Sequence, residues 1–132
     1  MNIAIRYCSK TKFSNTKRIA GAMAEALNIK AISVTDETRL NEHVDILFLG
    51  GAPYANIMAT ELRDYANNLD KDKVSKVVLF TTSNWSRRTV LALRKLLKEK
   101  GIGVADSYFY AHMLNIDNSI DKAKKFALQA IS

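Results

Sequence analysis

The order of apolar and amphipathic segments predicts an α/β sandwich of three layers built around a five-stranded parallel sheet. Residues 44–49 and 77–80 are apolar almost without interruption, which is typical of strands that are buried on both faces of a parallel sheet. The stretches after the predicted strands repeat apolar residues at helical spacing, as the crossover helices of such a sheet do.

The first half of the chain contains both kinds of predicted strand, buried apolar strands and a more polar edge strand. Residues 3–7 predict the first strand, and residues 14–27 predict the helix that follows it. Residues 29–34 alternate polar and apolar side chains, which indicates an edge strand. Residues 35–43 are polar and are expected to hold at most a short, irregular helix before the buried strand at 44–49.

The second half continues the alternation and ends on a helix. Its first two helices are expected at residues 59–69 and 87–100, and its strands at residues 77–80 and 103–110. The last helix is predicted to begin after Asn118 and Ser119, because side chains of these types cap helix N-termini. We expect one domain over residues 1–132.

The polarity of the strands predicts their order in the sheet. The apolar strands belong in the centre, and the two strands that contain polar residues, at 29–34 and 103–110, belong at the edges. This arrangement gives the order 2-1-3-4-5. In such a sheet a ligand binds outside the carboxyl ends of the strands, near the switch point between strands one and three. The loops at residues 8–13, 50–58 and 81–86 are expected to meet there.

Composition and charge limit the class of protein. The 132 residues are 48% apolar and carry a formal net charge of +7, which favours acidic partners without specifying a fold. Met1-Asn2-Ile3 runs directly into the first strand, so we expect no signal peptide and a cytoplasmic protein.

No apolar run approaches the ~20 residues of a membrane span. A single cysteine, Cys8, excludes an internal disulfide and a thiolate metal cage, and no spacing indicates a metal site.

The loop after the first strand has the composition of a phosphate cradle. Hydroxyl side chains stand at positions 9, 11, 14 and 16, and Lys10, Lys12, Lys17 and Arg18 add positive charge. The first N–H groups of a helix have no partner within the helix, and the helix dipole makes this end partly positive. A strand-to-helix turn with added hydroxyl donors is therefore suited to a phosphate group.

Together these loops resemble those of the flavodoxin family, and the similarity of pattern to a short-chain flavodoxin covers nearly the whole chain. The family's first loop has the pattern Ser/Thr-x-Thr-Gly-x-Thr/Ser, and here it reads Ser9-Lys10-Thr11-Lys12-Phe13-Ser14. The second loop resembles the family's in reading Gly50-Gly51-Ala52-Pro53-Tyr54-Ala55-Asn56, and the third in reading Thr81-Thr82-Ser83-Asn84-Trp85.

The resemblance implies a protein that binds FMN and transfers electrons, more an electron carrier than an enzyme with its own substrate and catalytic residues. The phosphate side of the implied FMN site comprises Ser9, Lys10, Thr11, Lys12, Phe13, Ser14 and Asn15. The ring side comprises Ala52, Pro53, Tyr54, Ala55, Asn56, Thr82, Ser83, Asn84 and Trp85. Tyr54 and Trp85 offer aromatic surfaces for a flat ring. We expect a monomer or a weak dimer, whose redox partner has an acidic docking face.

Three alternatives stay open. Lys12 stands where the family pattern has glycine; if this position needs a positive φ, lysine costs about 1 kcal/mol or more, so the chain could have a flavodoxin fold without tight FMN binding. Cys8 precedes an anion loop that is similar to the loop of IIB-type phosphocarrier domains, which makes a phosphotransfer protein with Cys8 as acceptor the alternative from a different class. The basic residues at 87–100 allow a nucleic-acid module, although the aromatic residues of a single-strand binder are missing.

Overall fold

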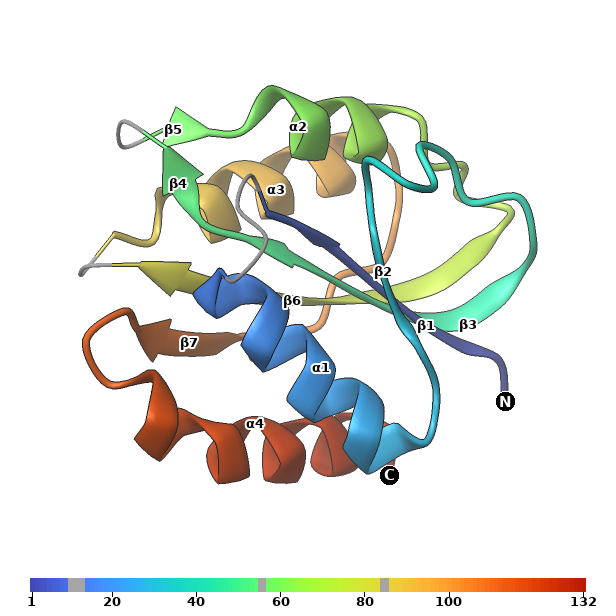
Figure 1. Ribbon diagram of the computed structural model, residues 1–132. Helices are drawn as coiled ribbons and strands as arrows, with labels where there is room; N and C mark the ends of the chain where they lie inside the picture. Colours follow the sequence, from blue (N-terminus) through green and yellow to red (C-terminus); the bar gives the residue numbers. More distant parts are fainter. Residues whose placement is uncertain (10–13, 55–56, 84–85) are drawn as a thin grey trace.

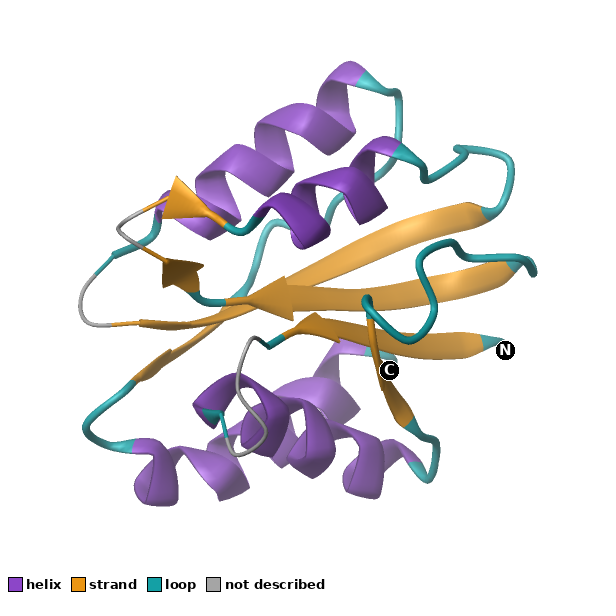
Figure 2. Cartoon of the chain, turned by 45° about the horizontal axis from the view of Figure 1, so that its top comes forward, coloured by secondary structure: helices purple, strands orange, loops and turns teal. Residues whose placement is uncertain are grey.

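The architecture is a parallel sheet between two pairs of helices (Figures 1 and 2). The structure is a computed structural model that describes residues 1–9, 14–54, 57–83 and 86–132. The sheet consists of β1 (Ile3–Cys8), β2 (Ala31–Ser33), β3 (Val44–Gly51), β6 (Val74–Ser83) and β7 (Phe109–His112). These strands are parallel and lie in the order β2-β1-β3-β6-β7, which confirms the predicted order 2-1-3-4-5.

Each face of the sheet is covered by two helices, and each pair encloses a separate core. The helices are α1 (Asn15–Leu27), α2 (Thr60–Asn67), α3 (Arg88–Glu99) and α4 (Ile116–Ala130). Helices α1 and α4 cover one face, and α2 and α3 cover the other (Figure 2). Phe48 points into the first core and Leu47 and Leu49 into the second, all three fully buried. This alternation explains why the central strands are apolar throughout.

Several element boundaries differ from the predicted ones. β6 runs over Val74–Ser83, so it is longer at both ends than the apolar run that predicted it. Residues 35–43 contain turns and irregular backbone but no helix. α4 begins at Ile116, with Asn115 at the N-cap position, and not after Ser119. Ile116 is 4% exposed and belongs to the core, so burial of this side chain brings the helix start forward.

The loop after β3 contains two short antiparallel strands, β4 (Pro53–Tyr54) and β5 (Ile57–Met58), which the sequence did not predict. Among the described residues, no helix has the length and apolar character needed to cross a membrane.

One charged side chain is buried in the core under α2. Arg6 of β1 has a side chain that is 7% exposed, and its Nη2 lies 2.9 Å from a carboxylate oxygen of Glu37. Its Nη1 donates a hydrogen bond to the carbonyl of Ile5, while its Nε is buried and has no hydrogen-bond partner among the residues that the structure describes. Tyr65 of α2 is buried beside this group. Burial raises the pKa of Tyr65 to about 12, against the opposing effect of the Arg6 charge and with a smaller contribution from Glu37.

The Arg6–Glu37 ion pair connects the irregular segment after β2 to β1. We therefore expect Glu37→Gln to destabilise the protein. Removing one partner of a buried ion pair leaves a buried charge uncompensated. Because Glu37 itself is 45% exposed, water replaces part of the interaction, and the expected loss is about 1–3 kcal/mol in the free energy of unfolding. Urea unfolding measures this loss.

The matched control is Glu42→Gln. Glu42 is exposed on the same segment and forms no ion pair with any residue that the structure describes. Its substitution should change stability by less than about 0.5 kcal/mol. Equal effects of the two substitutions would contradict the anchoring role of Glu37.

Candidate functional site

The carboxyl ends of the three central strands lie side by side at one edge of the sheet. Cys8, the last residue of β1, is in register with Gly51 of β3, and Gly51 is in register with Thr81 of β6. The loops that leave these strands therefore start next to one another, as predicted. We call this part of the molecule the carboxyl edge.

The N-terminus of α1 presents hydrogen-bond donors at the carboxyl edge. Ser14 is the N-cap residue, and its Oγ accepts the N–H of Lys17 at 3.1 Å. The same Oγ lies 2.5 Å from Oγ of Ser9, which donates to it. A hydroxyl that accepts two hydrogen bonds keeps one proton that it can donate. The N–H groups of the first turn have no carbonyl partner within the helix, so the donors at this turn suit an anion.

A buried pair of hydroxyls connects this turn to the end of β6. Thr16 of α1 and Thr82 of β6 are 1% and 2% exposed, and their Oγ1 atoms lie 2.7 Å apart. The hydroxyl of Thr81 donates to the carbonyl of Gly51 at 2.7 Å, which joins β6 to the end of β3. Side-chain hydrogen bonds thus fix α1, β3 and β6 relative to one another at the carboxyl edge.

Sequence reasoning missed the loop between β7 and α4, which also reaches the carboxyl edge. Met113 donates its N–H to the carbonyl of Ser83 at 3.0 Å, and its own carbonyl accepts the Asn15 side chain at 3.4 Å. Arg18 of α1 pairs with Asp117 of α4. The signal was available, because the predicted order places the end of the fifth strand beside that of the fourth.

The ring side of the predicted site is described only in part. Ala52 is half-buried, and Pro53 and Tyr54 form β4. Thr82 and Ser83 lie within β6 and not in a loop. The hydroxyl of Ser83 donates to the carbonyl of Ser86 at 2.5 Å, so both hydroxyls take part in bonds within the protein.

The remaining predicted residues lie outside the described residues. They are Lys10, Thr11, Lys12 and Phe13 of the first loop, Ala55 and Asn56 of the second, and Asn84 and Trp85 of the third. The prediction that Tyr54 and Trp85 flank a ring therefore stays a prediction, as does the role of Lys12.

Two glycines at the end of β3 are explained by packing. A Cβ atom on Gly50 would lie 2.3 Å from the carbonyl oxygen of Phe80, and one on Gly51 would lie 2.9 Å from a methyl group of Leu62. Neither position has room for a side chain, because β6 and α2 approach the backbone closely. The glycines thus allow the close approach of neighbouring elements, whatever binds at the carboxyl edge.

The thiol of Cys8 is buried in the core between the sheet and α2. Cys8 is 1% exposed and belongs to the same cluster as Leu62 and Tyr65. A phosphoryl acceptor must be reached by its donor, so this burial counts against the phosphotransfer alternative.

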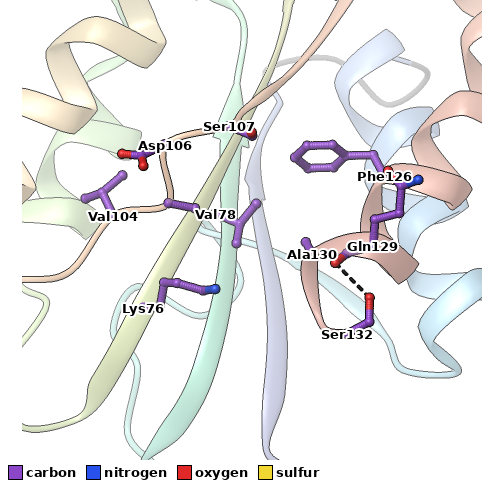
Figure 3. Close-up of a pocket in the computed structure, with 10 residues that line it drawn as sticks. Lys76, Val78, Val104, Asp106, Ser107, Phe126, Gln129, Ala130 and Ser132 are labelled. Carbon is purple, nitrogen blue, oxygen red and sulfur yellow. Dashed lines mark hydrogen bonds between the residues drawn. The ribbon is translucent and has the colours of Figure 1, made fainter.

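A hollow of about 560 Å³ lies away from the carboxyl edge (Figure 3). Val78 of β6 and Phe126 of α4 line it, with the Phe126 ring pointing from the helix toward the strand, and Lys76 stands at its side. A smaller hollow of about 330 Å³ lies at the carboxyl edge between the starts of α1 and α4, where Asn15 and Met113 line it.

The comparisons with known proteins agree with this geometry. No family model matches the sequence, and no curated protein is similar enough to count as a relative. A flavodoxin from the domain Archaea matches with a TM-score of 0.78 and 16% identity over 98% of this chain and 95% of its own. A Fusobacterium nucleatum flavodoxin bound to flavin mononucleotide matches with a TM-score of 0.73 and 18% identity over 99% of this chain and 97% of its own.

A third solved structure is a short-chain flavodoxin associated with a non-canonical PDU bacterial microcompartment. It has a TM-score of 0.71 and 18% identity, and the match covers 100% of both chains. At these identities the likenesses show the fold. The chain has the flavodoxin-like fold that the sequence predicted, over nearly its full length.

The Thr16–Thr82 pair generates a prediction about stability. Thr16→Val leaves the hydroxyl of Thr82 buried without its partner, which should cost about 1–3 kcal/mol in the free energy of unfolding. The double substitution Thr16→Val with Thr82→Val removes both polar groups, so its cost should be clearly less than the sum of the two single costs. Urea unfolding of the four proteins gives the coupling energy.

Thr60→Val is the control, because Thr60 is an exposed residue in the first turn of α2. Its expected small change in the free energy of unfolding measures what valine costs in the first turn of a helix, and this value is subtracted from the cost of Thr16→Val. Strictly additive effects of Thr16→Val and Thr82→Val would show that the hydroxyl pair contributes no coupling.

Proposed function

We propose that the protein binds FMN non-covalently and acts as an electron carrier. The observation that carries the proposal is the N-terminus of α1, where the Ser14 hydroxyl lies beside the Ser9 hydroxyl and the first-turn N–H groups. This set of donors suits the phosphate group of FMN.

The chemistry of this turn fits a dianion. Ser9, Ser14 and Asn15 are neutral, half-buried side chains, and the first turn of α1 contains no acidic residue. Lys17 adds positive charge on the exposed side of the helix, whereas the charge of Arg18 is paired with the carboxylate of Asp117. Lys10, Thr11, Lys12 and Phe13 complete the proposed phosphate loop.

The ring side of the proposal rests on the similar structures and on the sequence. The flavodoxin of Fusobacterium nucleatum is bound to flavin mononucleotide, and so is its lysine-to-glycine variant. We assign the corresponding role here to Ala52, Pro53, Tyr54, Ala55, Asn56, Thr82, Ser83, Asn84 and Trp85. When bound, FMN supplies the redox chemistry, while the chain binds and orients it and excludes water.

A titration of the purified protein with FMN tests the proposal directly. We expect a change in the flavin absorption spectrum with a dissociation constant in the micromolar range or below, and weaker binding of riboflavin, which lacks the phosphate. No spectral change at FMN concentrations of about 1 mM, roughly −4 kcal/mol of binding free energy, would refute it. A thiol-linked phosphoryl group on Cys8 after incubation with a phosphohistidine donor would favour the phosphotransfer alternative.

Ser14→Asp tests the phosphate contact without removing the helix cap. Aspartate caps a helix N-terminus as well as serine does, so the free energy of unfolding without ligand should change by less than about 1 kcal/mol. Its carboxylate, however, replaces a donor by a negative charge facing the phosphate. We expect the affinity for FMN to fall by at least about a hundredfold, equivalent to roughly 2.7 kcal/mol, and the affinity for riboflavin to change little.

Ser107→Asp is the matched control, because Ser107 is exposed near the hollow of Figure 3, away from the carboxyl edge. It changes the net charge equally and should leave both affinities unchanged. If Ser14→Asp weakened riboflavin and FMN binding equally, the phosphate would have to bind elsewhere.

A further inference from the structure

We propose that the outward face of α3 is a docking surface for an acidic protein partner. The proposal deepens the electron-carrier function and rests on it for the identification of this partner as the redox partner. The surface itself is defined by four exposed residues, Arg88, Leu91, Lys95 and Lys98, and we call it the α3 stripe.

The α3 stripe is the face of the helix opposite the core. Its members are spaced by three, four and three residues, which places them on one side of an α-helix. Val90, Leu93 and Leu97 face the other way and are fully buried. Packing therefore accounts for the inner face of α3, whereas the outer face is exposed to solvent.

A large apolar side chain lies in the middle of this charged face. Leu91 is 56% exposed, and it stands three residues from Arg88 and four from Lys95. A single exposed leucine is ordinary on a protein surface. An apolar centre with a charged rim, however, is the arrangement found in protein interfaces.

The cations of the stripe are available to a partner. Within the part of the chain that the structure describes, Arg88, Lys95 and Lys98 form no ion pair. Two other cations, one on this helix and one directly after it, form contacts within the protein. Arg94 donates to the carbonyl of Asp106 at 2.9 Å and lies over the ring of Tyr108, and Lys100 donates to the carbonyl of Asn67 at 2.8 Å.

The combination favours a protein over the other polyanions. From Arg88 to Lys98 the stripe is about 15 Å long, a patch at the small end of interfaces, where transient electron-transfer complexes lie. Nucleic-acid backbones are bound by cations and hydrogen-bond donors, with aromatic residues for stacking, and the stripe has no aromatic residue. One leucine is too little apolar surface to insert into a membrane.

The position of the stripe fits electron transfer. α3 begins directly after the third loop, and the N–H of Arg88 donates to Oγ of Ser86 at 3.3 Å. A partner seated on the stripe would therefore reach the carboxyl edge, where the proposed ring side lies. Opposite charges would raise the rate of encounter more than they would raise affinity.

The experiment measures binding of the full-length chain to cytochrome b5, an acidic haem protein, by amide NMR titration at low ionic strength, with and without added FMN. Cytochrome c, a basic haem protein, is the control probe. We expect amide shifts concentrated on α3 with cytochrome b5 and none with cytochrome c. Raising the salt concentration to about 0.5 M, where the Debye length falls to roughly 4 Å, should weaken the binding strongly.

Variants separate the stripe from the overall charge. Lys95→Glu with Lys98→Glu should weaken the binding at least tenfold, while Lys122→Glu with Lys125→Glu, the same charge change on exposed positions of α4, should change it less than twofold. Leu91→Gln keeps a good helix former and should weaken the binding by a factor of about three to ten. Equal losses from the two charge reversals, or no loss with Leu91→Gln, would overturn the proposal.

Two further titrations decide the class of partner. Tighter binding of oligothymidylate, or of vesicles of anionic phospholipid, with the same dependence on Lys95 and Lys98 would overturn the protein partner in favour of that polyanion. The FMN titration of the same variants is independent of all these results. If the protein binds FMN but shows no binding that depends on the α3 stripe, the docking surface alone is refuted. If it shows binding that depends on the stripe but does not bind FMN, the proposed cofactor alone is refuted.

Discussion

Burial of β1, β3 and β6 on both faces is the constraint on which the rest of the structure depends. Parallel strands can follow one another only if the chain returns across a face of the sheet, which here is done by helices except between β2 and β3, where the connection is irregular. All carboxyl ends then fall at the same edge. Polar side chains that the core excludes, such as Ser9 and Ser14, gather there, and so do the N-termini of the helices. The candidate site is therefore a consequence of how the sheet is buried.

Arg6 is a charged side chain within this buried sheet, and it shows what the sequence pattern could not predict. In sequence it reads as one polar residue in an apolar strand, and its alternation with Ile5 and Tyr7 is that of a strand side chain. Its partner Glu37 lies in a polar segment that gives no periodic signal. Long-range pairing of two charges depends on the path of an irregular segment, which neither helical nor strand periodicity encodes.

The elements that could be predicted are those that local chemistry determines. The strand order followed from polarity alone, and the start of the first helix near residue 14 followed from the helical spacing of the apolar residues after it. The short strands β4 and β5 and the start of α4 at Ile116 were missed, because each depends on what the segment packs against and not on its own residues. The same holds for the Thr16–Thr82 pair, where two ordinary hydroxyls meet only after folding.

The charges at the helix N-termini divide the four helices into two kinds. α2 and α4 each have an acidic residue in the first turn, Glu61 and Asp117, which complements the positive end of the helix dipole. α1 and α3 have none, and each has a cation near its start, Lys17 in one and Arg88 in the other. Cations at this end disfavour the helix by a few tenths of a kcal/mol each.

The dipole interaction therefore does not account for the cations near the starts of α1 and α3. α1 begins beside the hydroxyls of Ser9 and Ser14, and α3 begins at the end of the third loop. A negative group bound at the first helix and a negative surface docked on the second would each reverse the unfavourable interaction with the dipole. The same electrostatic argument thus connects the proposed phosphate site and the α3 stripe, which lie on opposite faces of the sheet and share its carboxyl edge.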